Sequence, residues 1–223
     1  MTRQFSIIRV SRGVLLACVA WVALFAASQA SANDMARGKQ LYALCAQCHT
    51  ENGMGAQLYL APAIAGLDEW YVNAQLLNFR SGIRGTNWQD VGGLRMHPMS
   101  RWLKSDEDVS AVAAYVSAMP KVDPPAVVEG GDPVTGKALY ATCASCHGPE
   151  GQGMKTMNAP PLVHMSDWYL VSSLEKFKAG IRGWNPQNTN AVMMRGMSNL
   201  LPNEQAIKDV VAYITTLNVQ EQP

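Results

Sequence analysis

The sequence lacks an excess of charge of either sign. Its 223 residues carry a formal net charge of +1, and only 16% of them are charged. Three of the 18 basic residues (Arg3, Arg9 and Arg12) precede the first acidic residue, Asp34, which leaves 15 basic residues against 17 acidic residues in the rest of the chain. A basic surface for a phosphate backbone is therefore absent, which excludes a nucleic-acid partner.

Long apolar runs are also absent after the N-terminal segment. The uncharged run Val14 to Ala27 has 14 residues, which is short for a membrane-spanning helix of about 20 residues. The three leading arginines and the small residues up to Ala32 are typical of a secretory signal, so we expect a signal peptide over residues 1–32 and a soluble, exported mature protein beginning at Asn33. An uncleaved anchor, or a lipoprotein modified at Cys18, is the alternative.

The rest of the chain consists of two copies of one unit. Gly38 to Cys45 returns as Gly136 to Cys143, an offset of 98 residues, and the register continues without a gap to Met119 opposite Leu217. Two tandem domains explain this repeat better than a solenoid does. We expect domain 1 over residues 33–119, a linker rich in proline and glycine over 120–133, and domain 2 over 134–219.

Helical signals occur in both copies, and alternating apolar runs that would indicate strands are missing. We expect an all-α protein in which each copy is a small bundle of about three to five helices. Asp132 followed by Pro133 suits a helix start, with Asp34 as its equivalent, and Ser105 with the acids after it suits another. Further helices are expected over 71–79, 169–177 and 202–217, and loops between them.

Four of the five cysteines lie in two C-x-x-C-H motifs. Cys45, Cys48 and His49 form the first motif, and Cys143, Cys146 and His147 form the second. This pattern is typical of c-type haem, in which the thiols form thioethers to the vinyl groups and the histidine is an axial iron ligand. A zinc site, a redox dithiol or a disulfide is the alternative, but two copies at one register after a signal peptide favour two covalently bound haem c groups.

Methionine is the usual sixth ligand of cytochrome c iron. Of the 12 methionines, only Met96 with Met194 and Met99 with Met197 match across the repeat. Both pairs precede the last helix of their copy, where a side chain can reach the haem face opposite the histidine. Spacing alone leaves open which pair binds iron and which packs beside the porphyrin.

Other polar and aromatic residues carry weaker signals. His97 and His164 are not repeated and are expected in loops or on the surface. Trp70 and Trp168 are expected to pack beside haem. For Arg84 and Arg182, pairing with a haem propionate and a solvated surface position are both open.

These motifs resemble tandem class I cytochromes c of the cytochrome c4 family over Gly38 to Leu217. The resemblance implies that Pro62 and Pro160 support the axial histidines through their carbonyl groups and that Met96 and Met194 are the distal ligands. It also implies two domains facing each other across a pseudo-twofold axis, in a protein of the periplasm or of the periplasmic membrane face.

The expected function is outer-sphere electron transfer rather than catalysis. The resemblance implies partners among membrane oxidoreductase complexes, from quinol-oxidising complexes towards terminal oxidases or reductases, with no small-molecule substrate. A diheme peroxidase needs an open iron position, and a diheme thiosulfate dehydrogenase needs a further cysteine. An electron-accepting subunit of a periplasmic dehydrogenase remains the other alternative.

Overall fold

The computed structural model describes residues 33–217, and within that range it contains helices, loops and two isolated β-bridges but no strand. The all-α prediction is therefore confirmed. The first half contains a helix that includes residues 33–49, η1 (Gln57–Tyr59), α2 (Glu69–Arg80), α3 (Val91–Ser100) and α4 (Asp106–Ser117). The second half repeats this order with α5 (Pro133–His147), η2 (Lys155–Met157), α6 (Asp167–Lys178), α7 (Thr189–Ser198) and α8 (Glu204–Leu217).

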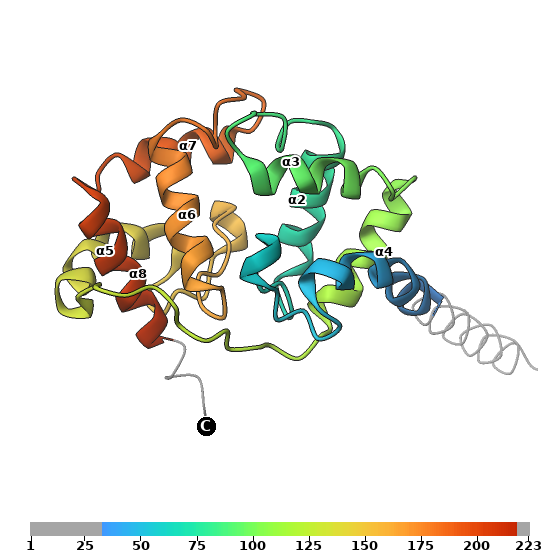
Figure 1. Ribbon diagram of the computed structural model, residues 1–223, viewed down its shortest axis with the longest axis horizontal. Coiled ribbons are helices and arrows are strands. Elements are labelled where there is room, and N and C mark those ends of the chain that lie inside the picture. Colours follow the sequence, from blue (N-terminus) through green and yellow to red (C-terminus); the bar gives the residue numbers. More distant parts are fainter. Residues whose placement is uncertain (1–32, 218–223) are drawn as a thin grey trace, which may run out of the picture.

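The two halves lie next to each other, and residues 120–132 run between them along one edge of the molecule (Figure 1). This connection is held by Asp167 at the start of α6, whose Oδ2 accepts hydrogen bonds from the N–H groups of Val127 (2.7 Å) and Val128 (2.8 Å). Asp167 is only 3% exposed, so these backbone donors replace the hydrogen bonds to water that its buried carboxylate has lost. The connecting segment is thereby fixed to the second half.

The expected helix starts are mostly confirmed. The Ser105 side chain accepts from the Asp108 N–H, and the Asp132 side chain accepts from the N–H groups of Val134 and Thr135, so both residues satisfy backbone donors that a helix start leaves unpaired. Asp34 is different, because it is itself helical and therefore is not an N-cap.

Two helices occupy segments that we expected to be loops. α3 and α7 contain glycines, asparagine or proline, which obscure a helical pattern. Their starts are capped by Asp90, which accepts from the Gly93 N–H, and by Asn188, which accepts from the Ala191 N–H. These local caps compensate for weak helix propensity.

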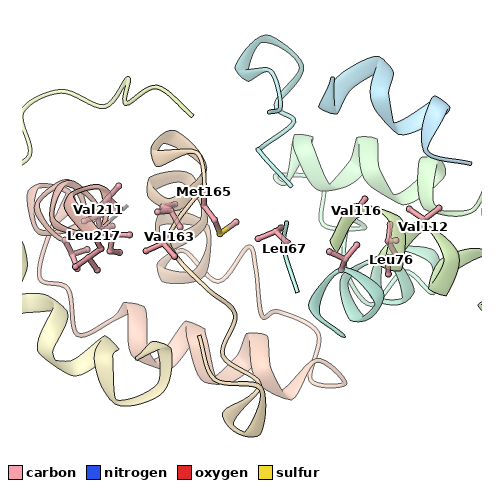
Figure 2. Packing of buried hydrophobic residues seen from close by; sticks show 14 of the residues in the cluster. Leu67, Leu76, Val112, Val116, Val163, Met165, Val211 and Leu217 are labelled. Atoms are coloured by element: carbon pink, nitrogen blue, oxygen red, sulfur yellow. The ribbon is translucent and has the colours of Figure 1, made fainter. Parts of the chain in front are cut away.

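The core is one cluster of buried side chains that extends through both halves. α4 contributes Val109, Val112 and Val116, and α8 contributes its own valines and isoleucines, all on one face of each helix. Figure 2 shows Met165 and Leu67 between the groups of labelled residues from the two halves. The domains therefore share apolar packing and are not connected by the linker alone.

The first and last helices of each half cross at a glycine. A methyl group on Gly38 would collide with the carbonyl of Ala111 in α4, and one on Gly136 would collide with the carbonyl of Asp209 in α8. Beside each crossing a tyrosine pair packs with ring centroids 5.4 Å apart, Tyr42 with Tyr115 and Tyr140 with Tyr213. The glycines therefore set how closely these helices approach.

We expect Gly136→Ala to lower the free energy of unfolding by about 1–3 kcal/mol, because the added methyl group overpacks the α5–α8 crossing. Gly196→Ala is the matched control, since no atom outside its own helix lies within 4 Å of the added methyl group. The control should be neutral or stabilising by about 0.5–1 kcal/mol. Denaturant unfolding of the haem-loaded protein measures both, and equal effects would contradict this explanation.

Candidate functional site

Both C-x-x-C-H motifs lie at the C-terminal end of the first helix of their half, which ends at residue 49 in one half and at His147 in the other. The four cysteines of residues 33–217 are not joined in disulfides. Burial raises the pKa of the Cys45 thiol to about 11 and also raises the pKa of the Cys143 thiol. The thiols of Cys45 and Cys143 are therefore protonated at neutral pH.

The two motif histidines are buried and oriented in the same way. Nδ1 of His49 lies 2.8 Å from the carbonyl oxygen of Pro62, and Nδ1 of His147 lies 2.8 Å from that of Pro160. Burial lowers the pKa of both imidazoles, and the hydrogen bonds to the carbonyl groups oppose this only in part. Each ring is therefore neutral, and when Nδ1–H donates to the carbonyl, Nε2 carries the lone pair available to iron.

Each half has a cavity beside its motif histidine. The first cavity, of about 320 Å³, is lined by His49, Pro62 and Met96 among others. The second, of about 350 Å³, is lined by the predicted site residues Cys143, Cys146, His147, Pro160 and Met194. Cys45 and Cys48 precede His49 on the same helix but do not line the first cavity.

The repeated methionines are arranged differently in the two halves. In the first half Met96 lines the cavity, whereas Met99 does not and is 37% exposed. In the second half Met194 and Met197 both line the cavity, and so does the unrepeated Met193. The geometry thus separates the two candidates in the first half but not in the second.

The two cavities share a wall made by both domains. Six residues line both cavities, namely Tyr71, Gln75, Met165, Tyr169, Ser173 and Arg182. Trp168 of the second half lines the first cavity, and Trp70 of the first half lines the second cavity. Each tryptophan therefore packs beside the site of the other half, a cross-domain arrangement that the sequence alone does not reveal.

The lining of the first cavity carries an excess of positive charge. Arg84 donates to the Gln75 side chain (2.6 Å) and, across the domain boundary, to the Tyr169 hydroxyl (3.0 Å), yet its buried Nε has no hydrogen-bond partner. Arg182 donates to the Ser173 hydroxyl at 2.7 Å. Burial and the charge of Arg84 lower the pKa of Arg182, whereas the pKa of Arg84 is raised, because Tyr169, Tyr71 and Asp90 outweigh the effect of its burial.

The charged side chains that line the first cavity are Arg84, Arg182, Lys176 and Asp90, so three cations face one carboxylate. Burial alone would raise the pKa of Tyr169, but the nearby Arg84 and Arg182 lower it to about 7. Buried charges need partners, and haem carries two propionate carboxylates that would supply them. The wall therefore fits haem, and of the two roles left open for the arginines, propionate pairing suits their partly buried positions.

The unrepeated histidines have other partners. Nδ1 of His97 lies 2.5 Å from the Phe79 carbonyl oxygen, and Nδ1 of His164 lies 2.7 Å from Asp123 Oδ1. Within residues 33–217, no group of three or more His, Cys, Asp or Glu residues is arranged to hold a metal ion. The described residues thus offer no site for a metal ion held by side chains alone. The motif histidines and cysteines, together with the repeated methionines, suit haem.

Two helical halves, each with a C-x-x-C-H motif, a buried oriented histidine and an adjacent cavity, define a tandem c-type cytochrome. A family model for cytochrome c matches residues 35–120 and again residues 133–218, and the chain belongs to the cytochrome c family. It carries two covalent haem c groups and is a diheme electron carrier of the cytochrome c4 type.

Proteins and solved structures that are similar to this chain are consistent with its assignment to this class. A thiosulfate dehydrogenase electron acceptor of Stutzerimonas stutzeri is 31% identical over 89% of this chain and 93% of its own length. The crystal structure of reduced cytochrome c4 from Pseudomonas stutzeri superposes with a TM-score of 0.62 at 27% identity, covering 80% of this chain and 95% of that one. A thiosulfate dehydrogenase structure from Marichromatium purpuratum gives a TM-score of 0.66 at 27% identity over 82% of this chain, which spans 40% of that longer protein.

Sequence reasoning missed several residues of the sites. Asp90, Lys176 and Tyr169 line the cavities or their shared wall. Asp90 and Lys176 belong to no recognisable motif, whereas Tyr169 belongs to a Trp-Tyr pair that repeats Trp70 and Tyr71. The sequence nevertheless contained a signal for Asp90 and Lys176. The equivalent positions of the repeat are uncharged, with Asn188 in place of Asp90 and Asn78 in place of Lys176.

Proposed function

We propose that this chain is a periplasmic electron shuttle in which His49 and Met96 ligate one haem iron and His147 and Met194 ligate the other. The observation that carries this proposal is that each cavity is lined by one motif histidine and by the first methionine of the repeated pair. In the first half the exposed position of Met99 supports Met96. In the second half the register of the repeat, which matches Met194 with Met96, supports Met194 over Met197.

A bound haem supplies a one-electron ferric–ferrous couple. The chain holds a neutral imidazole on one side through a proline carbonyl and offers an uncharged thioether on the other. Apolar side chains around the first cavity, such as Leu67, Val72 and Leu76, keep water away from that site. A methionine ligand and a low-dielectric surround both favour the reduced state and raise the reduction potential.

Partners of this chain are redox proteins. We propose transfer from a quinol-oxidising complex towards a terminal oxidase or reductase. A second candidate is the acceptance of electrons from a thiosulfate-oxidising enzyme, favoured by the 31% identity to a thiosulfate dehydrogenase electron acceptor. In both cases the chain itself has no substrate, because all four cysteines of the described residues belong to the haem motifs and each cavity has a methionine for the sixth position.

Export is proposed from the leader, which lies outside the described residues. No helix in the described part of the chain is long and apolar enough to cross a membrane. We also propose domain bounds of 33–119 and 134–219 with a linker over 120–133, which the family matches to residues 35–120 and 133–218 support.

The intact mass of native protein tests export and haem attachment together. We expect the mass of residues 33–223 plus two haems under denaturing conditions, because thioether bonds survive denaturation. A mass that includes residues 14–27 would indicate an anchored protein instead. A gain of one haem would contradict the two-site assignment.

Replacing Met96 by Ala should abolish the sulfur-to-iron charge-transfer band of one haem and lower its potential, because the thioether ligand is lost. Met99→Ala is the control and should keep the band, at a cost of less than about 2 kcal/mol in stability, since this side chain is 37% exposed. Near-infrared absorption and redox titration measure both effects. Met194→Ala and Met197→Ala form the equivalent pair, and loss of the band only in the second member of either pair would reverse that assignment.

Reduction kinetics separate the proposed partners. Thiosulfate alone should leave both haems oxidised, whereas thiosulfate with a purified thiosulfate dehydrogenase should reduce them if the second candidate is right. Membranes that oxidise quinol should reduce the protein if the first candidate is right. Sustained thiosulfate oxidation by the chain alone would contradict the non-catalytic function.

A further inference from the structure

Each haem cavity is completed by the other domain, and the two contributions differ in charge. Lys176 of α6, in the second half, lines the first cavity, whereas Asn78 of α2, in the first half, lines the second cavity. These residues are equivalent by the 98-residue repeat. Asp90 lines the first cavity, and its equivalent Asn188 lines the second.

Asp90 and Lys176 form an ion pair across the domain boundary. Lys176 Nζ lies 2.8 Å from Asp90 Oδ1, and Asp90 is only 4% exposed. Burial alone would raise the pKa of Asp90, but the hydrogen bond and charge of Lys176, assisted by Arg84 and the Gly93 N–H, lower it instead. Asp90 is therefore ionised at neutral pH, and its charge is balanced chiefly by a residue of the other domain.

The negative charge of Asp90 is not needed for its local structural function. Asp90 caps α3 by accepting from the Gly93 N–H at 3.1 Å, and Asn188 caps α7 by accepting from the Ala191 N–H at the same distance. An asparagine thus performs this function in the second half without charge. What distinguishes the first half is the ion pair, and the ion pair lies in the wall of a haem cavity.

We infer that Asp90 and Lys176 are potential-setting residues that make the first haem site electrostatically different from the second, an inference that rests on the electron-transfer function proposed above. Lys176 supplies a cation from the second domain that stabilises the reduced, less positive state of the first site. Asp90 supplies an anion from the first domain that stabilises the oxidised state. The balance between them contributes to the sharing of one electron between the two haems.

The charges of Asp90 and Lys176 can each be removed by substitution with asparagine, which is the residue at the equivalent position of the other half. Asp90→Asn keeps a side-chain cap acceptor and leaves Lys176 unbalanced, so it should raise the potential of the first haem. Lys176→Asn removes one positive charge from the lining of the first cavity, so it should lower the same potential. One unbalanced charge at about 10 Å in a medium of effective dielectric constant about 20 changes an equilibrium constant on the order of tenfold, and we expect shifts of that order in electron sharing between the haems.

The test is a spectroelectrochemical titration of the haem-loaded full-length protein and its variants. The step belonging to the first haem is identified as the one that moves in Met96→Ala. The double variant Asp90→Asn/Lys176→Asn reproduces the uncharged pair of the second half, so it should shift the first potential less than either single variant does and bring it closer to the potential of the second haem. Lys178→Asn is the charge-matched control, because Lys178 lies on the same helix, bonds to the Leu201 carbonyl and lines neither cavity.

Shifts of opposite sign in the two single variants, larger for the first haem than for the second, would support the inference. The inference would be overturned by shifts of the same sign, by equal shifts of both haems, or by a shift in Lys178→Asn as large as that in Lys176→Asn. An ion pair that only holds the two domains together would give shifts that do not depend on the sign of the charge removed. The charge-transfer band of the unaltered protein is recorded first. Its absence would refute the proposed methionine ligation, whereas its presence with unshifted potentials would refute only the inference about the ion pair.

Discussion

The hydrogen bond between each motif histidine and a proline carbonyl is the contact on which each haem site depends. It joins the end of a helix to a residue 13 positions later and orients the ring towards the cavity. The loop between them is held by a second bond, from the Gly55 N–H to the His49 carbonyl (2.9 Å). Gly55 has a φ of +80° and passes so close to Pro62 that a side chain would collide with it, so the loop can close only with glycine there.

Both sites also depend on the wall that the two cavities share. Because six side chains line both cavities, these residues lie between the two sites. Next to this wall the domains bind each other, through Arg84 with Tyr169 and through the Ala63 N–H with the Ser166 hydroxyl (3.0 Å). Domain association and the environment of both haems are therefore determined by the same contacts.

Much of this organisation could be predicted from the sequence because it is local. The C-x-x-C-H motifs, the cap at Asp132 and the apolar face of α4 each depend on residues within a few positions of one another, and the repeat doubled every signal. The helices α3 and α7 were missed because their caps and glycines resemble loop signals. The crossed placement of Trp70 and Trp168 was missed because it depends on how two domains pack, which no local pattern encodes.

The repeat also separates two kinds of residue in the sites. Positions that agree between the halves, such as the motif histidines and the prolines that accept their hydrogen bonds, serve what both sites need. If both haems have the same ligands, any difference between their potentials has to come from positions at which the halves disagree. Among the charged residues that line the first cavity, the two without a charged equivalent belong to one ion pair, and each comes from a different domain. Inequality between the sites is thus a property of the assembled pair of domains and is absent from either domain alone.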